Sequence, residues 1–367
     1  MATSSVADLD AAFSSSYRQA RERFRAAATQ AGFTLAEYVN DRATGPEGEV
    51  LATDVAIKGP ADADRVVILS SGTHGIEGYC GSGCQVALLS AGEFDVLPSN
   101  VRVVLVHALN PYGFAHKRRV NEDNIDLNRN CLDFAAGVPT NTDYEDLHPV
   151  LAPEDYGLRP AHWDAQVGEW IKARGFPAFQ AAVSSGQYTR PDGLFYGGLA
   201  PSWSARTFRQ IVGEAAGSAR DILLMDIHTG LGAFGELEKI GLGNQVAIER
   251  ARRIWGSDVT NLAGGESNSA PVSGDISVPF FEELPAGAQG TAIALEFGTV
   301  DGVAVLKALR LDNWLYTQVE PEAKQDLQKV AEIKATIEAA FYPDDDRWRV
   351  CVYELARDAV RQGLSAS

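Results

Sequence analysis

Three short segments that lie far apart in the chain contain residues that commonly bind metal ions. They read THGIEG at residues 73–78, DIHTG at 226–230 and LEFG at 295–298. Together they offer His74, Glu77 and His228 as ligands. Catalytic zinc uses three protein ligands of this kind and leaves one position open for water, on which a second carboxylate such as Glu296 can act. The combination indicates a metal-dependent hydrolase.

His74 and Glu77 follow the apolar run 66–69, at a predicted turn from a strand into a helix. Open α/β sheets bind ligands at this end of their strands, so both side chains can point at one site. In the alternative interpretation the segment is an ordinary polar turn. Glu77 would then lie in the first helical turn because its charge suits the helix dipole.

Two further apolar runs end in residues that can do chemistry. His228 follows the run 222–227, where a single histidine is more often a core or loop residue than a ligand. Asp226 would face the same way on a strand, and it either orients an imidazole or caps a nearby loop. Glu296 closes the run 292–295, where a buried carboxylate needs a partner or a function. It is either a general base that takes a proton from water or a partner in a salt bridge.

A fourth segment contains Arg118 and Arg119, between NPYG at 110–113 and DLNRN at 126–130. Arginine presents a planar pair of donors that can bind a carboxylate through two hydrogen bonds. In the alternative interpretation, NPYG is a turn and the arginines are solvated surface charges.

The order of these motifs, from about residue 65 to residue 300, resembles that of the zinc carboxypeptidase family of the carboxypeptidase A type. More closely, it is similar to a bacterial branch of that clan whose function is unassigned. The resemblance implies that His74, Glu77 and His228 bind one zinc ion per chain and that Glu296 is the general base. It also implies a single α/β domain with a mixed, mostly parallel twisted sheet of about eight strands between helices.

The same resemblance implies how a substrate would be held. Asn128 and Arg129 would bind its free α-carboxylate, and Arg119 would polarise the scissile carbonyl, with Arg118 as the alternative. Digestive members of the family have a mobile tyrosine about twenty residues before the catalytic glutamate, but residues 271–289 contain none. Tyr196 is a substitute for it, or else a packed aromatic residue.

Two activities follow from the resemblance. The first is hydrolysis of small peptides next to a free carboxylate, as by a metallocarboxypeptidase. The second is deacylation of N-acyl amino acids, as in the related aspartoacylase and succinylglutamate desuccinylase branch, whose members carry a C-terminal β domain where this chain is helical from residue 301. A third reading is a non-catalytic protein that binds carboxylates. An aromatic insertion at 131–200 would narrow access and favour small substrates.

The composition narrows the possible partners. The net charge of −17 over 367 residues argues against nucleic acid, which needs a basic surface. No run approaches the roughly 20 apolar residues of a membrane span, and residues 1–24 lack the apolar core of a signal peptide. Four cysteines form no disulfide framework, and Cys80 and Cys84 are expected to be buried thiols. We therefore expect a cytoplasmic protein, of unknown oligomeric state.

Alternating strands and helices must position these residues, which predicts one catalytic domain over residues 1–367. The predicted strands cover residues 50–57, 65–70, 101–107, 221–227 and 291–296. The predicted helices cover residues 7–32, 78–90, 205–217, 247–255, 303–318, 321–340 and 346–362, so that the C-terminal segment 301–363 is helical. The insertion 131–200 is predicted to be loop-rich because of its prolines and glycine pairs.

Overall fold

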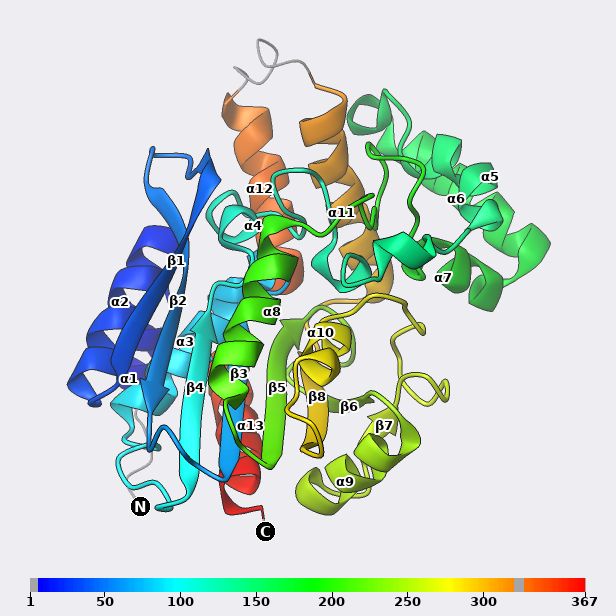
Figure 1. Cartoon of the computed structure of the whole chain (residues 1–367). Helices are drawn as coiled ribbons and strands as arrows, with labels where there is room; N and C mark the ends of the chain where they lie inside the picture. Colours follow the sequence, from blue (N-terminus) through cyan, green and yellow to red (C-terminus); the bar gives the residue numbers. More distant parts are fainter. Residues whose placement is uncertain (1–5, 320–326, 367) are drawn as a thin grey trace.

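The centre of the protein is an eight-stranded mixed sheet with strand order β1-β2-β4-β3-β5-β8-β6-β7 (Figure 1). The computed structural model describes residues 6–319 and 327–366. The strands are β1 (Thr34–Thr44), β2 (Val50–Lys58), β3 (Arg65–Ser71), β4 (Val101–His107), β5 (Asp221–Thr229), β6 (Leu237–Leu242), β7 (Thr260–Asn261) and β8 (Gln289–Phe297). The four central strands β4, β3, β5 and β8 are parallel, and β2 and β6 pair antiparallel with β4 and β8. The predicted fold class is confirmed.

Helices cover both faces of the sheet, which explains why β3 and β5 are continuous apolar runs. On one face α8 (Trp203–Ala216) and α10 (Ser277–Glu282) pack on Ile68 and Leu224. On the other, α3 (Gly78–Ser90) and α13 (Asp346–Ser365) pack on Leu69 and Met225 (Figure 1). Successive strand residues therefore enter two separate cores.

Most predicted helices are present, with changes at their ends. The remaining ones around the sheet are α1 (Val6–Ala12), α2 (Tyr17–Gln30), α4 (Pro111–Ala115), α9 (Gln245–Trp255), α11 (Gly302–Thr317) and α12 (Leu327–Phe341). The single helix predicted over 7–32 is wrong, because Ser16 caps a new helix by accepting a hydrogen bond from the Gln19 N–H. Of the helix predicted over 321–340, residues 321–326 lie outside the described residues.

The insertion 131–200 is less loop-rich than predicted. It contains α5 (Thr142–Leu151), α6 (Pro160–Arg174) and α7 (Phe176–Ser184). Pro160 and Pro177 lie in the first turn of their helices, where a missing N–H costs nothing, so these prolines start helices instead of marking loops. Tyr144 and Phe179 are buried in a small separate core, and the three helices lie together beside α11 (Figure 1).

Within residues 6–319 and 327–366, no helix combines the length and the apolar character that crossing a membrane requires.

Candidate metal centre and active site

The candidate residues meet where three neighbouring parallel strands end. His74 and Glu77 follow β3, His228 is the penultimate residue of β5, and Glu296 is the penultimate residue of β8. His228 and Glu296 are paired across the two strands. Because carboxyl ends of parallel strands lie at one edge of a sheet, residues more than 200 positions apart in the sequence come together here.

His74, Glu77 and His228 form a compact buried cluster. One ligand atom from each lies within 4.8 Å of the others. Nδ1 of His74 is 2.8 Å from Oε1 of Glu77, and Nδ1 of His228 is 2.9 Å from Oε2. Burial by itself would raise the pKa of Glu77, but the two histidines lower it well below its ordinary value. A carboxylate and two imidazole nitrogens that face one point fit a divalent ion such as zinc.

Each imidazole also has an aspartate on its far side. Nε2 of His74 is 3.3 Å from Oδ1 of Asp126, and Nε2 of His228 contacts Oδ2 of Asp226. Burial lowers the pKa of His228, but Asp226 and Glu77 raise it well above its ordinary value. Metal-binding histidines usually have such an acceptor, which fixes the ring and its tautomer. The geometry therefore favours an orienting role for Asp226 over the cap of a loop.

Asp226 is itself held in place. Its Oδ1 accepts hydrogen bonds from Ser70 Oγ at 2.6 Å and Thr73 Oγ1 at 2.9 Å. We expect Asp226→Asn to weaken zinc binding by about 10–100-fold, because the amide supplies a weaker acceptor to His228. Competition with a fluorescent chelator measures the change, and Asp258→Asn at an exposed position is the matched control. Equal zinc affinity of Asp226→Asn and the control would show that Asp226 does not orient His228.

Glu296 is buried and held by a tight turn. Its Oε1 accepts a hydrogen bond from the Leu231 N–H at 2.9 Å. The turn can approach β8 because residue 298 is glycine: a Cβ on Gly298 would lie 1.9 Å from the carbonyl oxygen of Ala233. Burial first, and then the charge of Glu77, raise the pKa of Glu296 to about 7. A carboxyl with such a pKa can accept and return a proton near neutral pH.

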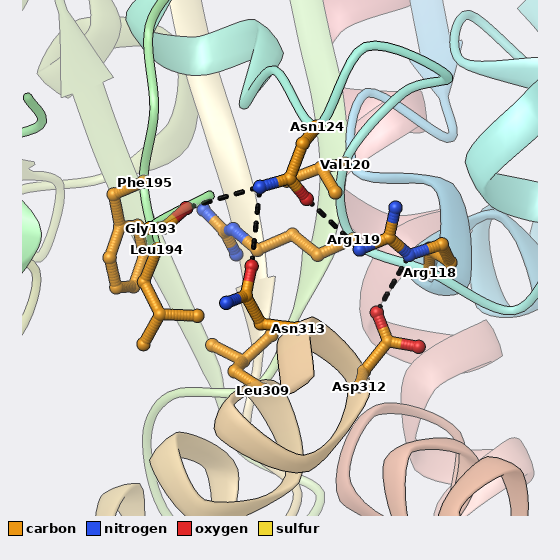
Figure 2. A pocket seen from close by; sticks show the side chains of 10 residues that line it. All are labelled: Arg118, Arg119, Val120, Asn124, Gly193, Leu194, Phe195, Leu309, Asp312 and Asn313. Atoms are coloured by element: carbon orange, nitrogen blue, oxygen red, sulfur yellow. Dashed lines mark hydrogen bonds and ion pairs between the residues drawn. The ribbon is translucent and has the colours of Figure 1, made fainter. Parts of the chain in front are cut away.

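The two adjacent arginines have different partners, and Figure 2 shows Arg118 bonded to Asp312 and Asn124. Arg119 donates from Nε to Asp126 at 2.8 Å, and its NH2 lies 2.8 Å from Nε2 of His74. Arg118 instead donates to Asp312 at 2.9 Å and stacks on the ring of Tyr316 at 3.6 Å. The structure brings Arg119 to the cluster and leaves Arg118, predicted as a possible substrate ligand, outside it.

Arg118 therefore has a structural role that can be tested. We expect Arg118→Met to lower the free energy of unfolding by about 3 kcal/mol, the low end for a broken buried ion pair, since Lys334 still contacts Asp312 at 2.6 Å. Urea unfolding measures this, with the exposed Arg347→Met as control. Zinc affinity should not change. Unaltered stability together with lost substrate binding would restore Arg118 to the site.

Arg129 is buried, with two donors left for an anion. Its Nε and NH2 donate to the carbonyl of Ser184, and its NH1 donates to the carbonyl of Asn128. A guanidinium has five N–H groups, so within the described part of the chain one remains on each terminal nitrogen. Burial lowers the pKa of Arg129, and the nearest contact with a carboxylate is 3.9 Å, to Asp126. Asn128 lies beside it and accepts a hydrogen bond from the Ile276 N–H.

Tyr196 is linked to the surroundings of the cluster through its backbone. Its backbone carbonyl accepts a hydrogen bond from the Asp126 N–H at 2.8 Å. Burial and the carboxylate of Asp123 raise the pKa of its hydroxyl. Its neighbour Phe195, which sequence reasoning missed, lies over the guanidinium groups of Arg119 and Arg129.

Asp126 is the second residue that sequence reasoning missed. It is the first residue of the DLNRN motif and caps the following turn by accepting a hydrogen bond from the Asn128 N–H. Aspartate is common at positions that cap a turn, and this cap is the only feature of the sequence that points to Asp126. In the structure it contacts both His74 and Arg119.

Glu282 and Glu283 both pair with Arg209. Cys80 and Cys84 are buried free thiols. A second group of three or more histidine, cysteine or carboxylate ligands is absent from the described residues.

Comparisons with known proteins place this arrangement in context. The family model described as "Protein of unknown function (DUF2817)" matches residues 13–354. No curated protein matches the sequence. Among solved structures, the carboxypeptidase A from Helicoverpa armigera is 16% identical, with 89% of this chain and 74% of that chain covered and a TM-score of 0.45. The succinylglutamate desuccinylase from Chromobacterium violaceum is 16% identical, with 88% and 74% covered and a TM-score of 0.35.

Proposed function

The chain belongs to the DUF2817 family of proteins of unknown function, and we propose that it is a zinc-dependent hydrolase that cleaves an amide bond next to a free carboxylate. The observation that carries this proposal is the cluster of His74, Glu77 and His228. An aspartate lies behind each imidazole, and Glu296 lies beside the cluster. A purely structural polar cluster does not need this pattern, because two buried histidines can be satisfied without converging on one carboxylate.

Each residue has a role that follows from its contacts. A zinc ion bound by His74, Glu77 and His228 would supply an acidic water and polarise a carbonyl group. Glu296 would take the proton of that water on its carboxylate and pass it to the departing nitrogen. Arg119, held in place by Asp126, would stabilise negative charge on the carbonyl oxygen.

The substrate carboxylate would bind at Arg129. The carbonyl of Ser184 fixes one edge of this guanidinium through Nε and Nη2, and one N–H remains on each terminal nitrogen to bind an anion. The buried positive charge is only weakly paired at 3.9 Å, so an incoming carboxylate would supply the missing partner. Asn128, the residue before Arg129, would add a hydrogen bond to the same carboxylate.

The burial of the site favours small substrates. The exposed fraction is 5% for His74, 4% for His228 and 8% for Glu296. We infer that so buried a site accepts short peptides more readily than the tail of a folded protein. It equally suits N-acyl amino acids, which makes deacylation of the aspartoacylase and succinylglutamate desuccinylase type the second candidate. A carboxylate-binding protein without catalysis is the third.

One experiment separates the three candidates. Dipeptides, longer peptides and N-acyl amino acids are incubated with the protein, with and without a chelator, and released amino acids are quantified. Release from peptides that stops with the chelator supports the carboxypeptidase activity. Release from N-acyl amino acids alone moves the assignment to the deacylase. Binding of zinc without release from any compound overturns the hydrolase proposal.

A further inference from the structure

Phe195 lies against both arginines that the proposed function assigns to the substrate. The centre of its ring is 5.3 Å from the guanidinium carbon of Arg119 and 5.5 Å from that of Arg129. The ring is partly exposed, and it packs against the main core and the core of the insertion. Together with Arg119 it also lines a cavity of about 20 Å³, room for about one water molecule (Figure 2).

The backbone of Phe195 has a conformation that phenylalanine rarely adopts. Its φ of 53° lies in the left-handed region, where a bulky side chain is strained. Such strain persists only where the surroundings fix the conformation, and it is concentrated at functional sites.

The loop around Phe195 is fixed by an unusual set of hydrogen bonds. Every carbonyl oxygen from residue 190 to residue 197 accepts at least one. Asn124 donates to the carbonyls of residues 191 and 193, and Figure 2 shows the second of these bonds. Asn313 donates to the carbonyl of residue 192. Gln187 donates through its side chain and its backbone N–H, and the remaining donors are the Asn130 side chain and the Asp126 N–H. Donors from three separate segments of the chain hold these carbonyls, so the loop is firmly anchored.

From these observations we propose that Phe195 is a specificity-determining residue, a fixed wall that limits the side chain of the amino acid released by the reaction. The inference rests on the proposed function. Arg119 would contact the scissile carbonyl and Arg129 the carboxylate, and in a substrate these two groups are joined through the amide nitrogen and the α-carbon. A ring within 5.5 Å of both guanidinium groups would therefore lie close to the α-carbon and its side chain. Because these hydrogen bonds anchor the loop, a bulky side chain would meet the ring.

The test measures binding, so it does not depend on turnover. In zinc-loaded Glu296→Gln protein, calorimetry gives the Kd of N-acetylglycine and of N-acetylphenylalanine, with and without the additional change Phe195→Asn. Asparagine tolerates the left-handed backbone, so the loop keeps its conformation when the ring is removed. Phe176→Ala, at an exposed position of α7, is the control. Thermal melting of each variant verifies folding, and Phe195→Leu is the second variant if Phe195→Asn does not fold.

We expect the glycine compound to bind at least about 10-fold more tightly than the phenylalanine compound, and Phe195→Asn to remove most of that ratio. Phe195→Leu should reduce the ratio in part, and Phe176→Ala should leave it unchanged. An unchanged ratio in the Phe195 variants, a preference for the bulky compound, or no binding of either compound would overturn the proposal. If the ratio of the two Kd values changes as expected but the wild-type protein hydrolyses no compound, the hydrolase assignment is wrong and the role of Phe195 in binding still holds. If hydrolysis occurs but the ratio of the two Kd values does not depend on Phe195, only the proposed role of Phe195 is wrong.

Discussion

Glu296→Gln is expected to reduce kcat for amide hydrolysis by about 10²–10⁴-fold while the bound zinc remains in place. The amide side chain fills the same space and can still accept the hydrogen bond from the Leu231 N–H, so the turn around it should be preserved. It cannot take a proton from water. Burial and the neighbouring charge of Glu77 raise the pKa of the native carboxyl to about 7. The substitution thus removes the proton acceptor and little else.

Single-turnover kinetics and zinc content per chain together test this prediction. Glu249→Gln, on the exposed face of α9, is a matched control and should keep full activity. Retained kcat in Glu296→Gln would remove Glu296 from its proposed role. Loss of zinc together with activity would instead indicate that Glu296 supports the metal site.

The second large effect is expected for His228→Ala, which should abolish stable zinc binding and with it all hydrolysis. The substitution removes one of three ligands, so the loss of affinity should exceed the roughly 10–100-fold expected for loss of an outer partner. It also leaves the carboxylate of Asp226 buried without its imidazole, so the protein should become less stable. Equilibrium dialysis against zinc and thermal melting measure the two consequences.

His162→Ala is the control for His228→Ala, because His162 is exposed and its removal does not affect the cluster. Wild-type zinc affinity in His228→Ala would show that the ion binds elsewhere or that His228 is not a ligand. Added imidazole should restore part of the zinc binding if the cavity left by the ring stays open.

The cluster could be predicted from the sequence because its members share one local pattern. His74, His228 and Glu296 each stand where a continuous apolar strand ends, and parallel neighbouring strands bring such ends to one edge. The three strands were recognisable because both of their faces are buried. Strand β1, at one edge of the sheet, and strand β6, beside the two-residue edge strand β7, were missed because they are partly exposed and have mixed polar sequences.

The choice between Arg118 and Arg119 was beyond reach of the sequence. Their positions differ by one residue, and their directions are decided by partners distant in the chain. Asp312 on α11 forms an ion pair with Arg118, and Asp126 forms one with Arg119. Phe195 was missed for a similar reason, because only the fold reveals that one ring covers two arginines and that distant amides hold its loop.

The most direct measurement of the central claim is a zinc titration of metal-free protein during hydrolysis of an N-acyl amino acid or dipeptide. We predict that the rate rises in proportion to added zinc and reaches a plateau at one ion per chain. The same protein should not cleave a substrate whose carboxylate is replaced by a carboxamide, since Arg129 then has no anion to bind. Hydrolysis that is unaffected by removal and return of the metal, or one zinc bound per chain without release from any carboxylate-bearing amide, would contradict the account.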